Sequence, residues 1–144
     1  MSGFLGGYVH QVDEKGRLSL PASFRRDLAE NEPLVVVQVD ERSLTLYPGP
    51  AWRELSERLM ELRRKNPEYR GFVLEVTSRA VEVTPDRSGR VLIPAKLLQA
   101  VGISESAMLV GALDRIELWD PAQYEASRPV RTAELDRLAR EVFS

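Results

Sequence analysis

The sequence contains no cysteine, a single histidine, and no apolar run long enough to span a bilayer. The lack of cysteine excludes disulfides and thiolate metal sites, and it is compatible with a reducing cytoplasm. The stretch from Met1 to Gly7 has no basic segment and no long apolar run, so we expect no signal peptide there. The formal net charge of −2 argues against a surface coated in positive charge but not against a local basic patch.

The lone histidine bears on metal binding and catalysis. His10 has no cysteine or second histidine with which to form a zinc site, so we interpret it as a strand residue that faces solvent or a neighbour. The sequence shows no pairing of a nucleophile with a base, no cluster of metal ligands and no phosphate-binding loop. We therefore expect no enzymatic activity, no cofactor, no metal and no small-molecule substrate.

What the sequence does contain is a repeated motif. The stretch 13–21, Asp-Glu-Lys-Gly-Arg-Leu-Ser-Leu-Pro, is matched 73 residues later by the stretch 86–94, Asp-Arg-Ser-Gly-Arg-Val-Leu-Ile-Pro. Aspartate is favoured at the first position of a type I turn and glycine where the backbone needs a positive φ. Proline is favoured at the first position of a helix. Each motif therefore predicts a tight hairpin turn, a strand and a helix.

Hydrophobic periodicity predicts the same order of elements around each motif: a hairpin, a helix and a second hairpin. In the first unit we expect strands at 8–12, 17–20, 34–39 and 43–47, with a helix at 21–30. In the second unit we expect strands at 80–84, 90–93, 107–113 and 116–119, with a helix at 94–101 stopped by Gly102.

Further helices connect and follow the two units. Apolar residues at spacings of three and four predict a helix at 51–65, and Pro67 opens another that runs through Val76. A helix that starts at Pro121 is cut short near Arg128-Pro129. The tail 132–144 has apolar residues at helical spacing, and it is either a frayed terminal helix or a subunit contact.

These elements predict an α+β fold made by internal duplication. One unit is too small to bury a core alone, and two copies interleaved about a pseudo-twofold axis would form one compact β-barrel with flanking helices. We divide the chain into repeat 1 (6–52), a helical connector (53–79), repeat 2 (80–126) and a C-terminal tail (127–144).

The paired motifs, each Asp-x-x-Gly-Arg followed by a strand and a proline-led helix, resemble the swapped-hairpin barrel of the AbrB superfamily (SpoVT-AbrB domains). Two such motifs in one chain closely resemble the MraZ family of bacterial transcriptional regulators. Further matching stretches are Phe4-Leu5-Gly6-Gly7, Tyr47-Pro48, Asn66-Pro67, Met108-Leu109-Val110-Gly111 and Glu117-Leu118-Trp119. The resemblance covers residues 4–126 and leaves out the tail.

The resemblance implies a cytoplasmic, nucleoid-associated protein that binds double-stranded DNA and represses its own cluster of division and cell-wall genes. It implies a ring-shaped homo-oligomer that reads short direct repeats upstream of the promoter, with no membrane partner. Carried over to this chain, the DNA-binding positions are Lys15 and Arg17 in the first motif and Arg90 in the second, and we add Arg87 for its charge in the second turn. The second motif departs from the first, because its positive charge stands one position earlier in the turn.

The cations also support DNA binding by their chemistry. Arginine on a rigid hairpin can pair bidentately with guanine, whereas lysine more often contacts phosphate. We expect each unit to gather cations at its own turn: Lys15, Arg17, Arg25 and Arg26 in the first, and Arg87, Arg90 and Lys96 in the second. Each of these cations could instead be a solvated turn residue.

The remaining motif positions have a structural role in this interpretation. Asp13 and Asp86 are expected to cap their turns by accepting backbone hydrogen bonds, and Gly16 and Gly89 to supply the turn backbone. The alternative function is a protein-interaction module, such as the dimerising half of an antitoxin bound to a partner protein.

Overall fold

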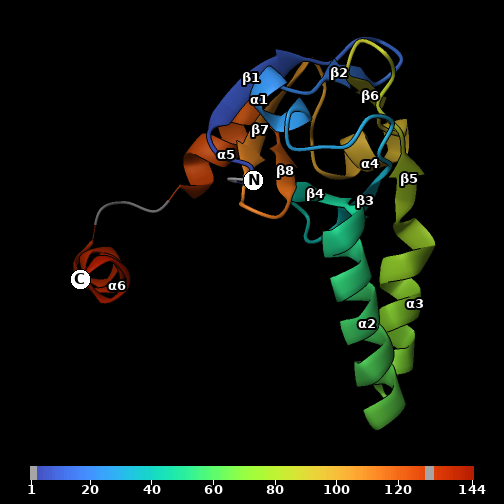
Figure 1. Ribbon diagram of the computed structural model, residues 1–144, viewed down its shortest axis with the longest axis vertical. Helices are drawn as coiled ribbons and strands as arrows, with labels where there is room; N and C mark the ends of the chain where they lie inside the picture. Colours follow the sequence, from blue (N-terminus) through green and yellow to red (C-terminus); the bar gives the residue numbers. More distant parts are fainter. Residues whose placement is uncertain (1–2, 129–131) are drawn as a thin grey trace.

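A computed structural model describes residues 3–128 and 132–144 of the chain. The fold is mixed α+β, with antiparallel sheets at one end and a pair of long helices projecting from it (Figure 1). The strands are β1 (Gly7–Gln11), β2 (Arg17–Ser19), β3 (Leu34–Gln38), β4 (Ser43–Pro48), β5 (Val81–Val83), β6 (Arg90–Leu92), β7 (Ser106–Gly111) and β8 (Ile116–Trp119). The helices are α1 (Ala22–Arg25), α2 (Gly49–Lys65), α3 (Tyr69–Arg79), α4 (Ala95–Ala100), α5 (Pro121–Ser127) and α6 (Ala133–Phe143).

The strand order shows the internal duplication directly. The six-stranded sheet has the order β1-β7-β8-β4-β3-β5, and replacing each strand by its counterpart in the other unit gives the same order read from the opposite edge. The remaining strands, β2 and β6, pair with each other, and Leu18 lies opposite its own counterpart Val91. A pseudo-twofold axis therefore passes through the β2–β6 pair and between β4 and β8.

The expectation that each motif turn joins two paired strands is wrong. β1 pairs with β7 of the other unit, and β2 pairs with β6. The alternation of buried and exposed side chains along β2 is satisfied equally by a local or a distant partner. Exchange across the axis is favoured because it lets the two units complete a single core. The second hairpin of each unit, β3–β4 and β7–β8, forms as expected.

The helix expected at 21–30 is also wrong in length, since α1 ends at Arg25. Phe24 is the one fully buried side chain on it, so a single turn is enough to anchor this segment. The chain then continues through tight turns, and Asn31 adopts a left-handed φ of 59°. The other expected helices form, and Gly102 has the positive φ of 73° that ends a helix after α4.

The tail is helical from Ala133 to Phe143, with the Thr132 side chain accepting a hydrogen bond from the backbone N–H of Leu135. The expected stop at Pro129 lies outside the described residues. In the described part of the chain, no helix combines the length and apolar character needed to cross a bilayer.

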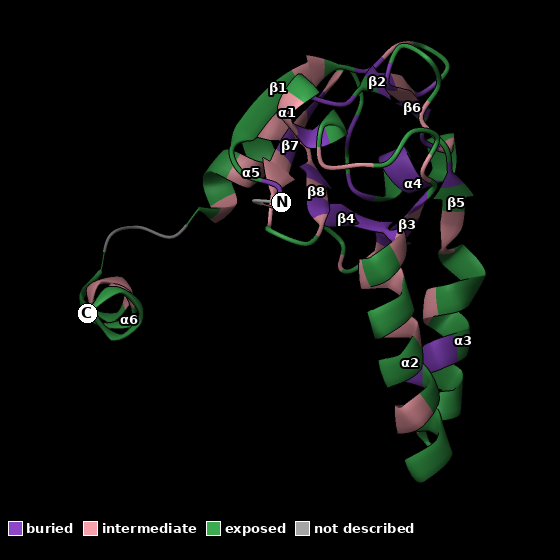
Figure 2. Ribbon diagram, viewed as in Figure 1, coloured by how far each residue is buried: buried purple, intermediate pink, exposed green. Residues whose placement is uncertain are grey.

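The hydrophobic core draws on both units (Figure 2). The inward side chains of the β2–β6 pair pack with those of the six-stranded sheet, so neither unit has a core of its own. Its largest fully buried members are Leu18, Leu20, Phe24, Leu34, Val36, Leu44, Leu46, Val91, Ile93, Leu109, Ile116 and Leu118.

Candidate nucleic-acid interface

The β2–β6 pair, here called the ribbon, lies at the end of the molecule opposite the tips of α2 and α3 (Figure 1). Leu18 and Val91 point into the core, whereas the alternate residues face outward. The outward residues are Arg17, Ser19, Arg90 and Leu92, with Arg17 opposite Leu92 and Ser19 opposite Arg90. The two motif turns lie at opposite ends of this ribbon. Gly16 and Gly89 are four residue positions apart along it, which corresponds to about 13 Å at 3.3 Å per residue.

The first turn is closed by its aspartate. The Asp13 Oδ1 accepts hydrogen bonds from the backbone N–H groups of Lys15 and Arg17, each at 2.9 Å. The Arg17 Nε donates to Asp13 Oδ2 at 2.7 Å. Gly16 has a φ of 90°, and its carbonyl accepts a hydrogen bond from Ile93 of the other unit at 2.9 Å. Turn and ribbon are thus fixed to each other.

The second turn repeats this geometry. The Asp86 Oδ1 accepts from the backbone N–H groups of Ser88 and Arg90 at 2.9 Å each, and the Arg90 Nε donates to Oδ2 at 3.0 Å. The Gly89 carbonyl accepts from Leu20 at 2.9 Å. Within the described residues, no hydrogen bond occupies the terminal nitrogens of Arg17 or Arg90. Each guanidinium is therefore held at one edge and open at the other.

Both aspartates are stabilised in their ionised form. The backbone N–H of Arg17, together with its side chain and the N–H of Lys15, lowers the pKa of Asp13 to about 2. The backbone N–H of Arg90 lowers the pKa of Asp86 in the same way. Both carboxylates therefore remain charged, and each keeps its arginine in place, across the whole physiological pH range.

We expect acid to weaken the fold through these turns. Since the pKa of Asp13 is lowered in the folded state, its contribution to stability is complete above the unfolded pKa near 3.9 and is lost as the pH falls towards 2. Urea unfolding midpoints measured from pH 5 to pH 2 should fall less steeply for Asp13→Asn than for the parent protein. Glu14→Gln, in the same turn, should keep the parent slope. Equal slopes for all three proteins would show that Asp13 has no such role.

The two turns differ in the side chain from the neighbouring helix that contacts them. The Arg25 Nη1 of α1 donates to the Ser88 carbonyl at 3.1 Å, so Arg25 belongs to the second turn, not to the first as its unit suggested. Its counterpart in the other unit is Leu98, which packs against Gly16 of the first turn. This correction follows from the strand exchange, because each helix lies beside the turn of the opposite unit.

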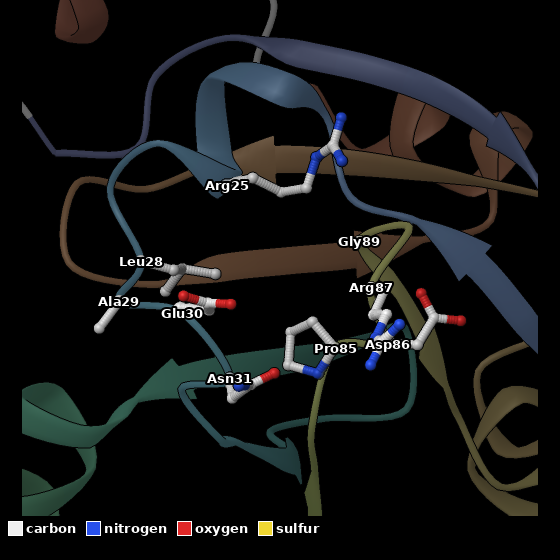
Figure 3. A pocket seen from close by; sticks show the side chains of 9 residues that line it. All are labelled: Arg25, Leu28, Ala29, Glu30, Asn31, Pro85, Asp86, Arg87 and Gly89. Atoms are coloured by element: carbon white, nitrogen blue, oxygen red, sulfur yellow. The ribbon is translucent and has the colours of Figure 1, made fainter.

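A hollow of about 470 Å³ opens between the second turn and the segment that follows α1 (Figure 3). Arg25 and Arg87 line it together with Asp86 and Glu30, so its charges are mixed. Arg87 is exposed in the second turn, as Lys15 is in the first. Lys96 instead lines another hollow, beside Gln38 and Arg79.

The expected site residues thus meet on one surface. Lys15, Arg17, Arg87 and Arg90 lie on the ribbon or at its two turns, with Asp13, Gly16, Asp86 and Gly89 shaping the backbone beneath them. His10 lies close by, with its Nδ1 and the Ser19 carbonyl 2.6 Å apart. Among the described residues, no group of histidine, cysteine, aspartate or glutamate side chains is arranged to hold a metal ion.

Comparison with known proteins identifies the family. The family model described as "MraZ protein, putative antitoxin-like" matches residues 4–74 and 76–136. The chain belongs to the MraZ family. Its match in two segments agrees with two tandem copies of the family's domain.

Individual relatives match over nearly the whole chain. A protein named transcriptional regulator MraZ from Thermomicrobium roseum is 35% identical over 96% of this chain and 96% of its own length. Its namesake from Chlorobaculum tepidum is 36% identical over 87% of this chain and 88% of its own. A third from Mycobacterium tuberculosis is 36% identical over 85% and 84%. Membership of this family of regulators confirms the expectation that the chain is not an enzyme.

A solved structure also shows some similarity. The solution structure of PHS018 from Pyrococcus horikoshii is 14% identical, with a TM-score of 0.37, over 82% of this chain and 96% of that one.

Proposed function

We propose that this chain is a sequence-specific DNA-binding transcriptional regulator that places the ribbon and its two turns in the major groove. The main support for the proposal is the geometry of two arginines. In both Arg17 and Arg90 the Nε donates a hydrogen bond to the turn aspartate, and both terminal nitrogens are open on the outward face. The major groove is about 12 Å wide and admits a two-stranded ribbon.

The hydrogen bonds to the aspartates make these arginines better suited to recognise bases. An arginine that is already ordered loses less side-chain entropy on binding. Its terminal nitrogens can donate to the O6 and N7 atoms of one guanine, which fixes both position and identity. Lys15 and Arg87, exposed in the turns, are placed to contact phosphates on either side. Net charge −2 does not oppose this arrangement, because a local group of cations at the ribbon and its turns is sufficient for binding.

The finer features of the proposal come from the family. We propose that the ribbon and the six-stranded sheet together form a swapped-hairpin barrel and that the protein acts in the cytoplasm, at the nucleoid. Its target is proposed to be short direct repeats upstream of its own promoter, in a cluster of division and cell-wall genes that it represses as a ring-shaped oligomer. Repeats about one helical turn apart, roughly 10 base pairs, would present the same groove to successive copies.

A footprint on the DNA upstream of its own coding sequence tests this proposal. Regular protection at intervals of one helical turn supports the regulator. Co-purification with one stable protein partner and no footprint supports the antitoxin-like interaction module instead, a possibility also present in the description of the family model. The subunit count, measured by light scattering on the same sample, tests the ring.

The surface offers a specific site for self-association. Phe4 is 4% exposed and the ring of Tyr8 packs edge-on against Phe24, whereas Leu5 is 55% exposed and open to a partner. More informative is the outer face of the six-stranded sheet. α3 packs on β3, where Val37 is buried, whereas the equivalent Val110 on β7 is only half-buried.

In order along the chain, α6 follows α5 as α3 follows α2. Both α3 and α6 have 11 residues, but α6 lies apart from the sheets (Figure 1) and none of its residues is buried. An isolated helix of this length is marginal in water, so it gains stability from a partner. The uncovered sheet face continues the surface on which α5 packs, out to Val9 at the edge. We propose that α6 of one copy covers this face of the next copy.

Removing the apolar face of α6 should therefore reduce the assembly. Leu138 and Val142 are both exposed on this face, and Leu138→Asp with Val142→Asp should shift the native mass from oligomer to monomer without lowering the unfolding midpoint of the monomer. Arg137→Ala is the matched control, because Arg137 lies on the polar face and bonds to Glu141 at 2.7 Å. An oligomer of unchanged size in the double variant would place the contact elsewhere, first at Leu5.

A further inference from the structure

The outward face of the ribbon is not symmetric, although the ribbon's backbone is. Arg17 and Arg90 are counterparts in the two repeats, but the other two outward positions differ: Ser19 in β2 corresponds to Leu92 in β6. Leu92 is 53% exposed, while its neighbours Val91 and Ile93 are almost fully buried. An exposed leucine between two arginines contributes little to the core.

Leu92 also has a shaped setting. It lines a hollow of about 540 Å³ together with the apolar side chains of Val81 and Val83 and the polar side chains of Lys15, Glu82 and Thr84. Leu92 therefore lies beside a mixed surface that carries one cation and one carboxylate. Ser19 lies at the other end of the ribbon. Its side chain is exposed, and its carbonyl oxygen lies close to His10. The two ends thus offer different chemistry to whatever lies against them.

We propose that Leu92 contacts a thymine methyl group in the major groove and thereby gives the ribbon a direction on DNA. This inference rests on the proposed function. A ribbon with identical ends would favour a site with twofold symmetry, because operator symmetry mirrors protein symmetry. An apolar side chain discriminates thymine by its C5 methyl group, whereas a serine hydroxyl accepts several bases. The difference between Leu92 and Ser19 therefore makes one end of the site thymine-dependent and the other permissive.

Other differences between the repeats reinforce this direction. Arg25 supports the second turn through the Ser88 carbonyl, whereas Leu98 supports the first through an apolar contact. The tip cation is Lys15 in one turn and Arg87 in the other, one position apart. A copy bound in the reversed orientation would exchange all of these contacts. Copies in a ring that share one orientation would read direct repeats, not inverted ones.

The test replaces thymine by deoxyuridine, which removes only the methyl group and leaves the protein unaltered. The probe is a duplex that spans the footprint upstream of the protein's own coding sequence, with one thymine replaced at a time in every repeat. Affinity should fall about fourfold per engaged copy at one thymine position, the change expected for one buried methyl group. Leu92→Ser should bind the thymine and deoxyuridine duplexes equally.

Exchanging the two residues provides the matched control. Ser19→Leu combined with Leu92→Ser should move the deoxyuridine sensitivity to the opposite end of each repeat, while Ser19→Leu alone should create sensitivity at both ends. If the protein gives a footprint but binds the thymine and deoxyuridine duplexes with equal affinity at every position, this inference is wrong and the proposed function still holds. The absence of any footprint for the parent protein overturns the proposed function itself.

Discussion

Arg17→Ala should lose sequence discrimination, whereas Lys15→Ala should lose affinity for all DNA alike. A bidentate contact with guanine contributes about 1–3 kcal/mol of discrimination, so each engaged copy should lose roughly five- to 150-fold in specific affinity without Arg17. In an oligomer bound to successive repeats these losses multiply through effective concentration. A phosphate contact instead shifts binding to specific and scrambled DNA together, and losing Lys15 should reduce the salt slope by about one.

The measurement is a titration of specific and scrambled duplexes at two salt concentrations. Arg17 also bonds to Asp13, so its removal changes the turn, and a control must separate the two effects. Arg42→Ala provides a comparison, because it also removes an arginine that bonds to a turn aspartate: the Asp40 carboxylate accepts from the Arg42 backbone N–H and from its Nη2. That turn joins β3 to β4, away from the ribbon. Arg42→Ala should bind DNA as the parent does, whereas parent-like specific binding by Arg17→Ala would mean that the ribbon does not read the sequence.

Much of the fold could be predicted because the repeat carries strong local signals. The spacing of Asp13, Gly16 and Pro21 predicts turn, strand and helix start, and its recurrence at Asp86, Gly89 and Pro94 predicts a twofold relation. The strand order and the pairing of Leu18 with Val91 agree with that relation. These features depend on backbone preferences and alternation, which act within a few residues.

The small size of each unit predicted that the two units would interleave, but the same local signals could not predict which strands pair with each other. Alternation along β2 specifies which side chains face the core, but it does not specify which strand supplies the hydrogen bonds. The position of Arg25 was missed for that reason, since it follows the first motif in sequence but contacts the second in space. With the exchange known, the offset of 73 residues would have placed Arg25 and Leu98 at equivalent sites behind opposite turns. The contacts of the ribbon with DNA remain predictions.

Gly16→Ala should destabilise the fold more than any other glycine substitution in the turns. Gly16 has a φ of 90°, and a Cβ there would lie 2.5 Å from the backbone carbonyl oxygen of Ile93, directly after β6 at the end of the ribbon. The unfavourable φ alone costs about 1–2 kcal/mol for an L-residue. The backbone clash comes in addition, because the ribbon ladder and the core on its inner side hold Ile93 in place. We expect a total loss of roughly 3–5 kcal/mol, a large part of the stability of a typical domain.

Two other glycines separate these contributions. Gly102 has a φ of 73° with open space around the added atom, so Gly102→Ala measures the backbone cost alone. Gly89 has a φ of 78°, and its added Cβ would meet the flexible side chain of Arg25, which can move aside. Urea unfolding should therefore rank the losses as Gly16 above Gly89, and Gly89 equal to or slightly above Gly102. Equal losses at Gly16 and Gly102 would show that the ribbon yields at Ile93. A pliable ribbon of that kind would not hold Arg17 and Arg90 in the fixed positions that reading guanine requires.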